Sequence, residues 1–155
     1  MRAVIQRVLQ AEVTVNGQIV GRIEKGILAY ISVAKPDTVK DAEFMADKLV
    51  NLRISPDEAG KMNRSLLDVG GAVLLVSNFT LHGDCRKGRR PAFDAAAEPG
   101  LANQLYEKLV ELVAGQGIAV EKGIFGADMQ VASVNDGPVT FILDTAQKTQ
   151  ISFSS

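Results

Sequence analysis

The feature that most constrains this chain is an Asn-Gly pair set in a run of alternating residues. Residues Val13–Val20 alternate between apolar and polar side chains on either side of Asn16 and Gly17. Both central residues of a type I′ turn need a positive φ, and Asn-Gly meets this need well. The alternation indicates strands with one buried and one exposed face. The segment therefore predicts a β-hairpin near the N-terminus.

The segments on both sides of this hairpin extend the predicted sheet. Ala3–Val8 precedes it and Gly26–Val33 follows it, and both are rich in residues that favour strands. We therefore expect the N-terminal third to form an antiparallel meander. A helix should follow, capped by Asp37 or Thr38, because apolar residues then recur every three or four positions. The residues of this stripe are Ala42, Met45, Ala46, Leu49 and Val50.

The remaining sequence predicts one more long helix and four further strands. Ala72–Leu81 is expected to be a strand that enters the core through its apolar residues. Gly115 and Gly117 should end an amphipathic helix that follows it. The apolar positions of that helix are Leu101, Leu105, Leu109, Leu112 and Val113. The last predicted strands are Ile118–Val120, Met129–Val134 and Val139–Leu143.

Together these elements predict one α+β domain over residues 1–155. Mainly antiparallel sheet, in a barrel-like or sandwich arrangement, should be covered by two main helices. A chain of 155 residues has the length of a single domain. No repeat, linker or low-complexity segment divides it. Gln147–Ser155 is a polar C-terminal tail to which the sequence assigns no structure.

Composition narrows the classes of function. Lys and Arg number 17 against 18 Asp and Glu, which gives a net charge of −1, so any contact with RNA must be local. Aromatic residues make up 5% with no Trp, which disfavours a base-stacking platform. The longest apolar run, near Ile27–Ala34, is far below the ~20 residues of a membrane-spanning helix. The N-terminal residues do not resemble a signal peptide, and a single cysteine forms no internal disulfide, so we expect a cytoplasmic location.

His82 and Cys85 are the only histidine and the only cysteine of the chain. A catalytic Cys–His dyad would need a turn at Gly83, because strand positions three apart face opposite sides. One Cys and one His are also too few for a zinc site, so no metal is predicted. The favoured interpretation is a polar strand end that runs into a loop.

Ser77, Asn78, Phe79 and Thr80 end the predicted strand. On a strand, Ser77 and Phe79 share one face while Asn78 and Thr80 share the other. A hydroxyl beside an amide can hold a carbonyl, a ribose or a water molecule. Ser and Thr are also routine on the half-exposed face of a sheet. Spacing alone favours this ordinary structural role over catalysis.

Two further segments have both an ordinary and a functional interpretation. The cationic run Arg86, Lys87, Arg89 and Arg90 is typical of a solvated loop, but arginine also binds phosphate through paired donors. The segment Asn135–Thr140 contains Asp-Gly between two β-rich runs, which favours a hairpin turn. A functional role there requires a cis Gly-Pro bond, and only about 5–6% of X-Pro bonds in folded proteins are cis.

Several stretches together resemble one family, the D-aminoacyl-tRNA deacylases. They occur in the family's order and reach from the N-terminus to about Asp144: "MRAVIQRV", "NLRI", "GKMNRSLLDVGG", "SNFTL", "RKGRRP", "FGADMQV" and "NDGPVTFILD". The resemblance implies an editing hydrolase that cleaves the ester of D-aminoacyl-tRNA, and of mischarged glycyl-tRNA. It also implies a homodimer that acts on the acceptor end of tRNA without a metal or another cofactor.

The resemblance also implies the site residues. The family's Ser-Gln-Phe-Thr motif corresponds to Ser77, Asn78, Phe79 and Thr80 as the catalytic segment. Its second motif, with a cis Gly-Pro bond that enters the partner subunit's pocket, corresponds to Asn135, Gly137, Pro138, Val139 and Thr140. On this basis Arg7 should brace the Gly-Pro loop, and Phe125 and Met129 should line the adenosine pocket.

The chain departs from the family's usual residues at three positions, where Asn78 replaces Gln, His82 replaces Tyr and Cys85 replaces Thr. Oxyanion stabilisation by main-chain N–H groups around Phe79 and Thr80 is the expected mechanism, with help from the ribose hydroxyl of the substrate. Two alternatives remain. One is a non-catalytic tRNA-binding module on the same fold, and the other is a thiol hydrolase that depends on Cys85.

Overall fold

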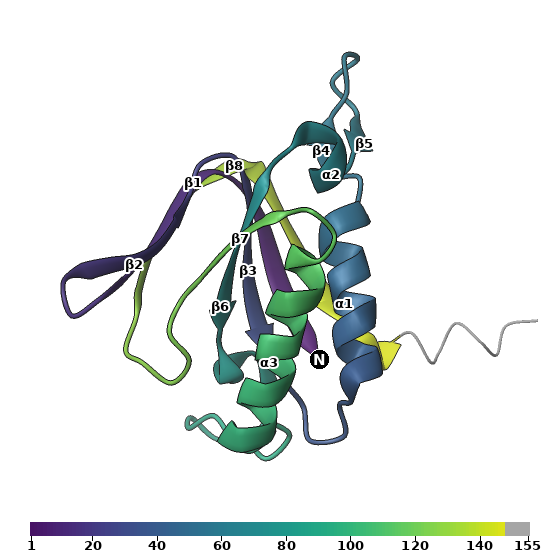
Figure 1. Ribbon diagram of the computed structural model, residues 1–155. Coiled ribbons are helices and arrows are strands. Elements are labelled where there is room, and N and C mark those ends of the chain that lie inside the picture. Colours follow the sequence, from purple (N-terminus) through teal and green to yellow (C-terminus); the bar gives the residue numbers. More distant parts are fainter. Residues whose placement is uncertain (148–155) are drawn as a thin grey trace, which may run out of the picture.

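The computed structural model describes residues 1–147. The predicted hairpin is confirmed: strands β1 (Arg2–Val15) and β2 (Gln18–Ile23) are antiparallel, and Asn16 and Gly17 have φ angles of 50° and 76°. A sheet with two long helices on one face makes up most of the molecule (Figure 1).

The predicted meander is wrong, because β3 (Gly26–Ser32) pairs with β1 and not with β2. Val8 lies opposite Gly26 in the same register that places Ala11 opposite Ile23. With 14 residues, β1 is long enough for β2 and β3 to lie end to end along one of its edges. The other edge of β1 pairs with β8 (Gln130–Asp144).

The sheet continues from β3 through two parallel strands, β6 (Ala72–Ser77) and β7 (Ala119–Lys122). From the edge of β1 that β2 and β3 share, the sheet runs through β3 to β6 and then β7, while β8 lies on the other edge of β1. The sheet curls until Gly21 of β2 lies against the Lys122 carbonyl at the end of β7, where a Cβ atom would come within 2.6 Å of that oxygen. The predicted α+β class and barrel-like arrangement are confirmed, with the two parallel pairings as an addition.

Two long helices, α1 (Val39–Asn51) and α3 (Pro99–Ala114), lie side by side over the sheet (Figure 1). All five residues of the predicted α1 stripe are buried, and Thr38 is the N-cap, with its N–H donated to the Asp41 carboxylate at 2.9 Å. The buried face of α3 comprises Ala102, Leu105, Tyr106, Leu109 and Val113. A short helix, α2 (Leu66–Val69), and a hairpin of β4 (Ser55–Pro56) and β5 (Met62–Arg64) lie beyond the end of α1.

Two predicted strand boundaries are wrong. The strand expected over Ala72–Leu81 ends at Ser77, and Phe79–His82 form a 3₁₀ turn, η1. The two strands expected on either side of Asn135–Thr140 form the single strand β8, since both halves pair antiparallel with β1. The register shifts between these halves, so the segment is a bulge in β8 and not a hairpin turn.

Two buried clusters fill the molecule. The larger lies between the sheet and the helices and includes Ile5, Leu75, Leu49 and Leu109, and the smaller lies on the opposite face of the sheet. Of the polar tail Gln147–Ser155, only Gln147 falls within the described residues. No helix among residues 1–147 is long and apolar enough to cross a membrane.

Candidate active site

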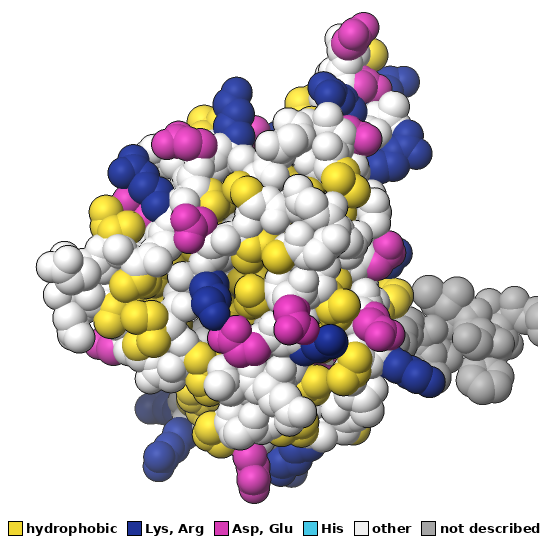
Figure 2. Space-filling view, viewed as in Figure 1, with side chains coloured by type: hydrophobic (Ala, Val, Ile, Leu, Met, Phe, Trp, Pro, Cys, Tyr) yellow, Lys and Arg dark blue, Asp and Glu magenta, His cyan; other side chains and the backbone are white. Residues whose placement is uncertain are grey.

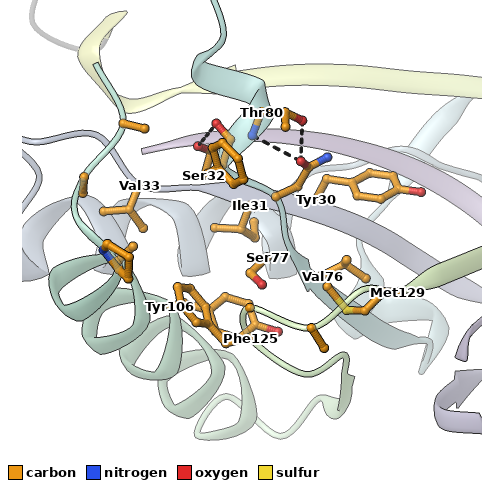
Figure 3. A pocket seen from close by; sticks show the side chains of 18 of the residues that line it. Tyr30, Ile31, Ser32, Val33, Val76, Ser77, Thr80, Tyr106, Phe125 and Met129 are labelled. Carbon is orange, nitrogen blue, oxygen red and sulfur yellow. Dashed lines mark hydrogen bonds between the residues drawn. The ribbon is translucent and has the colours of Figure 1, made fainter. Parts of the chain in front are cut away.

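A cavity of about 890 Å³ opens beside the carboxyl ends of β3 and β6 (Figure 3). The turn η1, helix α3 and the segment 125–131 form its other walls. Figure 3 shows Ser32 and Thr80 on one side of the cavity, with Phe125 and Met129 on another. The lining residues include Tyr30, Ser32, Ser77, Asn78, Phe79, Thr80, Phe93, Tyr106, Phe125 and Met129.

The η1 turn presents the predicted catalytic segment to this cavity. Asn78 begins the turn, and its side-chain Oδ1 accepts hydrogen bonds from the Thr80 hydroxyl at 2.5 Å and from the Thr80 N–H at 3.3 Å. Asn78 and Thr80 thus meet as the strand pattern suggested, but through a turn instead of a shared strand face. Phe79 is 58% exposed, and its ring packs edge-on against Phe93, with 5.0 Å between ring centroids.

Two side chains from the sheet, Ser32 and Arg2, hold the turn from behind. Ser32 donates from its hydroxyl to the Phe79 carbonyl at 3.3 Å, and the same oxygen lies 2.6 Å from His82 Nδ1. Arg2 donates to the Leu81 carbonyl at 2.7 Å. Burial lowers the pKa of His82, and the positive charges of Arg2 and the N-terminal amine lower it further. The interpretation of His82 as a polar strand end that runs into a loop is therefore wrong, because His82 belongs to the η1 turn and its side chain is buried and hydrogen-bonded.

Cys85 has no place in this cavity. Its side chain is exposed, and it is absent from the residues that line the cavity. The Nδ1 atom of His82 faces Ser32, so the structure shows no Cys–His dyad. Within residues 1–147, no group of three His, Cys, Asp or Glu side chains is arranged to hold a metal ion.

The second predicted group of residues gathers at the bulge of β8. The Gly137–Pro138 peptide bond is cis, and Gly137 has a φ of 127°. Arg7 donates to the Asp136 carboxylate at 3.1 Å and to the Ile54 carbonyl at 2.7 Å. Because Arg7 joins the bulge to the segment that follows α1, it fixes the position of the bulge on the sheet.

Asn135 closes the bulge from within. Its side-chain amide donates to the carbonyls of Arg7 at 2.9 Å and Val139 at 3.1 Å, and Thr140 donates to its Oδ1 at 3.4 Å. These contacts hold both ends of the bulge together, so that the segment between them projects as a fixed unit.

The structure does not bring the two groups of predicted residues together within one chain. Ser77–Thr80, Phe125 and Met129 line the cavity, whereas the residues around the bulge do not. The predicted site residues that do not line the cavity are Arg7, Asn135, Gly137, Pro138 and Thr140.

The predicted cationic run lies in the exposed loop after η1. Arg86 forms an ion pair with Asp84 at 2.8 Å, and this arginine lowers the pKa of Asp84 to about 2. Lys87, Arg89 and Arg90 are exposed. On the face shown in Figure 2, cationic and anionic side chains are interspersed, in agreement with the net charge of −1.

Ser32 and Tyr106 are lining residues that the sequence did not indicate. Tyr106 lies on the buried face of α3, donates to the Leu75 carbonyl at 2.9 Å and has a raised pKa because of its burial. Tyr106 lies one residue after Leu105 and three before Leu109, so it falls on the same face of the helix as the predicted apolar positions. This spacing was a usable signal in the sequence. Ser32 gave no such signal in the sequence, because its hydrogen bonds to η1 depend on the parallel pairing of β3 with β6.

Comparison with known proteins is consistent with this fold. The chain is 58% identical to the D-aminoacyl-tRNA deacylase of Fervidobacterium nodosum over 145 residues, which cover 94% of this chain and 97% of that protein. The corresponding protein of Thermus aquaticus is 55% identical over 148 residues, or 96% of this chain and 97% of its own.

Solved structures share the same fold. The c-Myc DNA Unwinding Element Binding Protein superposes with a TM-score of 0.88 at 38% identity, over 94% of this chain and 99% of its own. A probable eukaryotic D-amino acid tRNA deacylase superposes with a TM-score of 0.82 at 19% identity, over 92% and 98%, and shows the fold alone. Residues 4–144 match the sequence model described as D-Tyr-tRNA(Tyr) deacylase, and the chain belongs to this family.

Proposed function

We propose that this protein is an editing hydrolase that cleaves the ester bond of D-aminoacyl-tRNA. The observation that carries this proposal is the η1 turn, which sets the backbone of Phe79 and Thr80 at the wall of a cavity of about 890 Å³. Membership of the deacylase family supplies the substrate class. The terminal adenosine would lie against the apolar side chains of Phe125 and Met129, which line the same cavity.

Main-chain donors are the proposed source of oxyanion stabilisation. Within residues 1–147, no acceptor is bonded to the Phe79 N–H, so this donor is free to meet the negative oxygen of the tetrahedral intermediate. The Thr80 hydroxyl already donates its proton to the amide oxygen of Asn78. An amide oxygen is not a general base, so this contact does not activate Thr80 as a nucleophile. We therefore favour attack by water, assisted by the neighbouring ribose hydroxyl of the substrate.

The Gly137–Pro138 segment is proposed to enforce chirality across a homodimer. Its carbonyls would capture the α-amino group of the substrate, and an L side chain would then collide with this rigid wall. A D side chain points away, and glycine has none, so mischarged glycyl-tRNA would also be accepted. The support is geometric: the cis segment is braced by Arg7 and Asn135, yet it lies outside the cavity of its own chain.

The surface of β8 supports the proposed homodimer. Ile142 is 72% exposed on this strand, and Val134 and Phe141 are also exposed large apolar residues. Within the described chain β8 pairs only with β1, which leaves its outer edge open. Pairing of this edge with a second copy, together with burial of the Ile142 side chain, would remove both from water.

The exposed cations after η1 are proposed to contact the tRNA backbone. Lys87, Arg89 and Arg90 follow the turn closely, whereas Arg86 is already paired with Asp84. Their removal should weaken tRNA binding and reduce its dependence on salt concentration.

The decisive experiment compares deacylation of D- and L-aminoacyl-tRNA by the purified protein, with a chelator present. We expect release of the D-amino acid only, unchanged by the chelator. Equal rates on both substrates, or loss of activity with the chelator, would contradict the proposal. Binding of tRNA without release of the amino acid would support the non-catalytic module instead.

A further inference from the structure

Ser32 and His82 form a buried polar pair directly behind η1. Ser32 is 1% exposed and His82 is 7% exposed, and the mechanism proposed above uses neither. Ser32 comes from the end of β3 and His82 from the end of η1, so their contact joins the turn to the sheet. The Ser32 oxygen lies 2.6 Å from His82 Nδ1 and 3.3 Å from the Phe79 carbonyl oxygen.

The single proton of the Ser32 hydroxyl defines the direction of these bonds. A serine hydroxyl donates once and accepts through two lone pairs. If Ser32 donates to the Phe79 carbonyl, which only accepts, its contact with His82 requires a proton on Nδ1 of the imidazole. His82 then donates to Ser32, and Ser32 donates to Phe79. Both contacts are satisfied at once only in this arrangement.

The Phe79 carbonyl belongs to the peptide group whose nitrogen is the Thr80 N–H. The N–H of this peptide group is already donated to Asn78 Oδ1 at 3.3 Å. Fixing the carbonyl holds the peptide in place and so limits rotation about the Cα atom of Phe79, the residue that carries the free N–H. Oxyanion donors are effective only when they are held in place before the reaction, because any reorganisation adds to the barrier.

We propose that His82 and Ser32 are positioning residues that hold the η1 turn, and with it the free main-chain N–H of Phe79, for ester hydrolysis. This inference rests on the proposed function. Ser32 is not placed as a nucleophile here, since its side chain is buried and its hydroxyl is hydrogen-bonded to the Phe79 carbonyl.

The first test replaces His82. His82→Leu removes the donor, whereas His82→Asn retains an N–H close to the position of Nδ1. We expect His82→Leu to lower kcat about tenfold on D-aminoacyl-tRNA with KM unchanged, and His82→Asn to restore most of the loss. Equal kcat in the wild type and His82→Leu, or equal losses in both variants, would overturn the inference.

The second test asks whether the two residues act as a unit. Ser32→Ala should also lower kcat about tenfold, and adding His82→Leu to it should change kcat little further. Independent, multiplying effects would contradict a shared role. A fall of Ser32→Ala to the uncatalysed rate would also overturn the inference, because it would identify a nucleophile.

Ser65→Ala is the matched control for loss of a buried hydroxyl. Ser65 is 6% exposed, accepts from the Asp68 N–H at 3.1 Å and lies outside the cavity lining. It should lower Tm and leave kcat unchanged; an equal loss of kcat in Ser65→Ala would show that lost stability alone explains the effect. The wild type is assayed first: if it releases no D-amino acid, the proposed function fails and not this inference.

Discussion

At the scale of single residues, the chemistry proposed for this site lies in polar groups of a turn and not in the only histidine or the only cysteine of the chain. Asn78 is one carbon shorter than the glutamine that the family's motif implies, and its Oδ1 reaches back to the Thr80 hydroxyl and N–H. Residue chemistry alone did not single out Ser77–Thr80; the resemblance did. His82 was undervalued because burial is a tertiary property that its sequence neighbours do not reveal.

The contact between Thr80 and Asn78 leads to a prediction for Thr80→Ala. Because the hydroxyl donates to an amide and not to a base, we expect the variant to lose about tenfold or less in kcat. Single-turnover release of D-amino acid measures this, with the melting temperature as a check on folding. A loss of about a thousandfold or more would instead indicate that Thr80 is the nucleophile.

His82 also predicts how stability depends on pH. Burial, then the charges of Arg2 and the N-terminal amine, lower its pKa below the usual 6.5, and the carboxylates of Asp37 and Asp144 oppose this only in part. The unfolded chain therefore binds a proton at a higher pH than the folded chain does. The free energy of unfolding should be greatest above pH 6.5 and should fall as the pH drops from 6.5 towards the folded-state pKa.

Urea denaturation at pH 8 and pH 5 measures this effect. His82→Asn is the control, because every other titrating group is retained. We expect the loss of stability between the two pH values to be smaller in the variant. An equal loss in both proteins would assign the pH dependence to other groups.

At the scale of elements, the sequence predicted where helices form better than where strands end. The apolar stripe of α1 is complete in the sequence, since each turn of a helix repeats the same local pattern. The end of β6 depends on the side chain of Asn78, which caps a 3₁₀ turn where apolar Phe79 and Leu81 favoured a continued strand. The continuity of β8 depends on pairing with β1 more than 100 residues earlier, so Asp136-Gly137 read locally as a hairpin.

The close approach of β3 and β6 predicts the effect of Gly26→Ala. A Cβ atom at Gly26 would overlap the backbone of Ala72, including its carbonyl, and neither strand can move without breaking the sheet. We expect a loss of about 3 kcal/mol or more in the free energy of unfolding. Urea denaturation gives this value.

Gly100→Ala is the matched control on α3. Apart from its chain neighbours and the nearby backbone of its own helix, no atom lies within 4 Å of the position that its Cβ would take, and its φ is not positive. The substitution should stabilise the protein by about 0.5 kcal/mol, because it restricts the unfolded chain. Similar losses in both variants would show that the approach of β3 to β6 is not the cause.

At the scale of the whole molecule, the cavity of one chain and the segment proposed as its chiral wall lie apart. The braced Gly137–Pro138 segment lies outside the cavity that Ser77–Thr80 line. The sequence alone could not indicate this separation, because it depends on how β1 carries both β3 and β8 along its two edges. The proposed homodimer would resolve this separation, since each copy would complete the site of the other.

Activity should therefore depend on the surface of β8, even though this surface is outside the cavity. Ile142→Asp places a charge on the most exposed large apolar side chain among the described residues. Burying an unpaired carboxylate between two copies is strongly unfavourable, so we expect a monomer that has lost nearly all D-aminoacyl-tRNA hydrolysis. Light scattering after size-exclusion chromatography gives the mass, and single-turnover assays give the rate.

Ile19→Asp is the control, because Ile19 is 55% exposed on β2. This substitution should leave both the mass and the rate unchanged. A folded Ile142→Asp monomer that retains full, D-selective activity would show that each chain works alone, and the Gly137–Pro138 segment would then need another role.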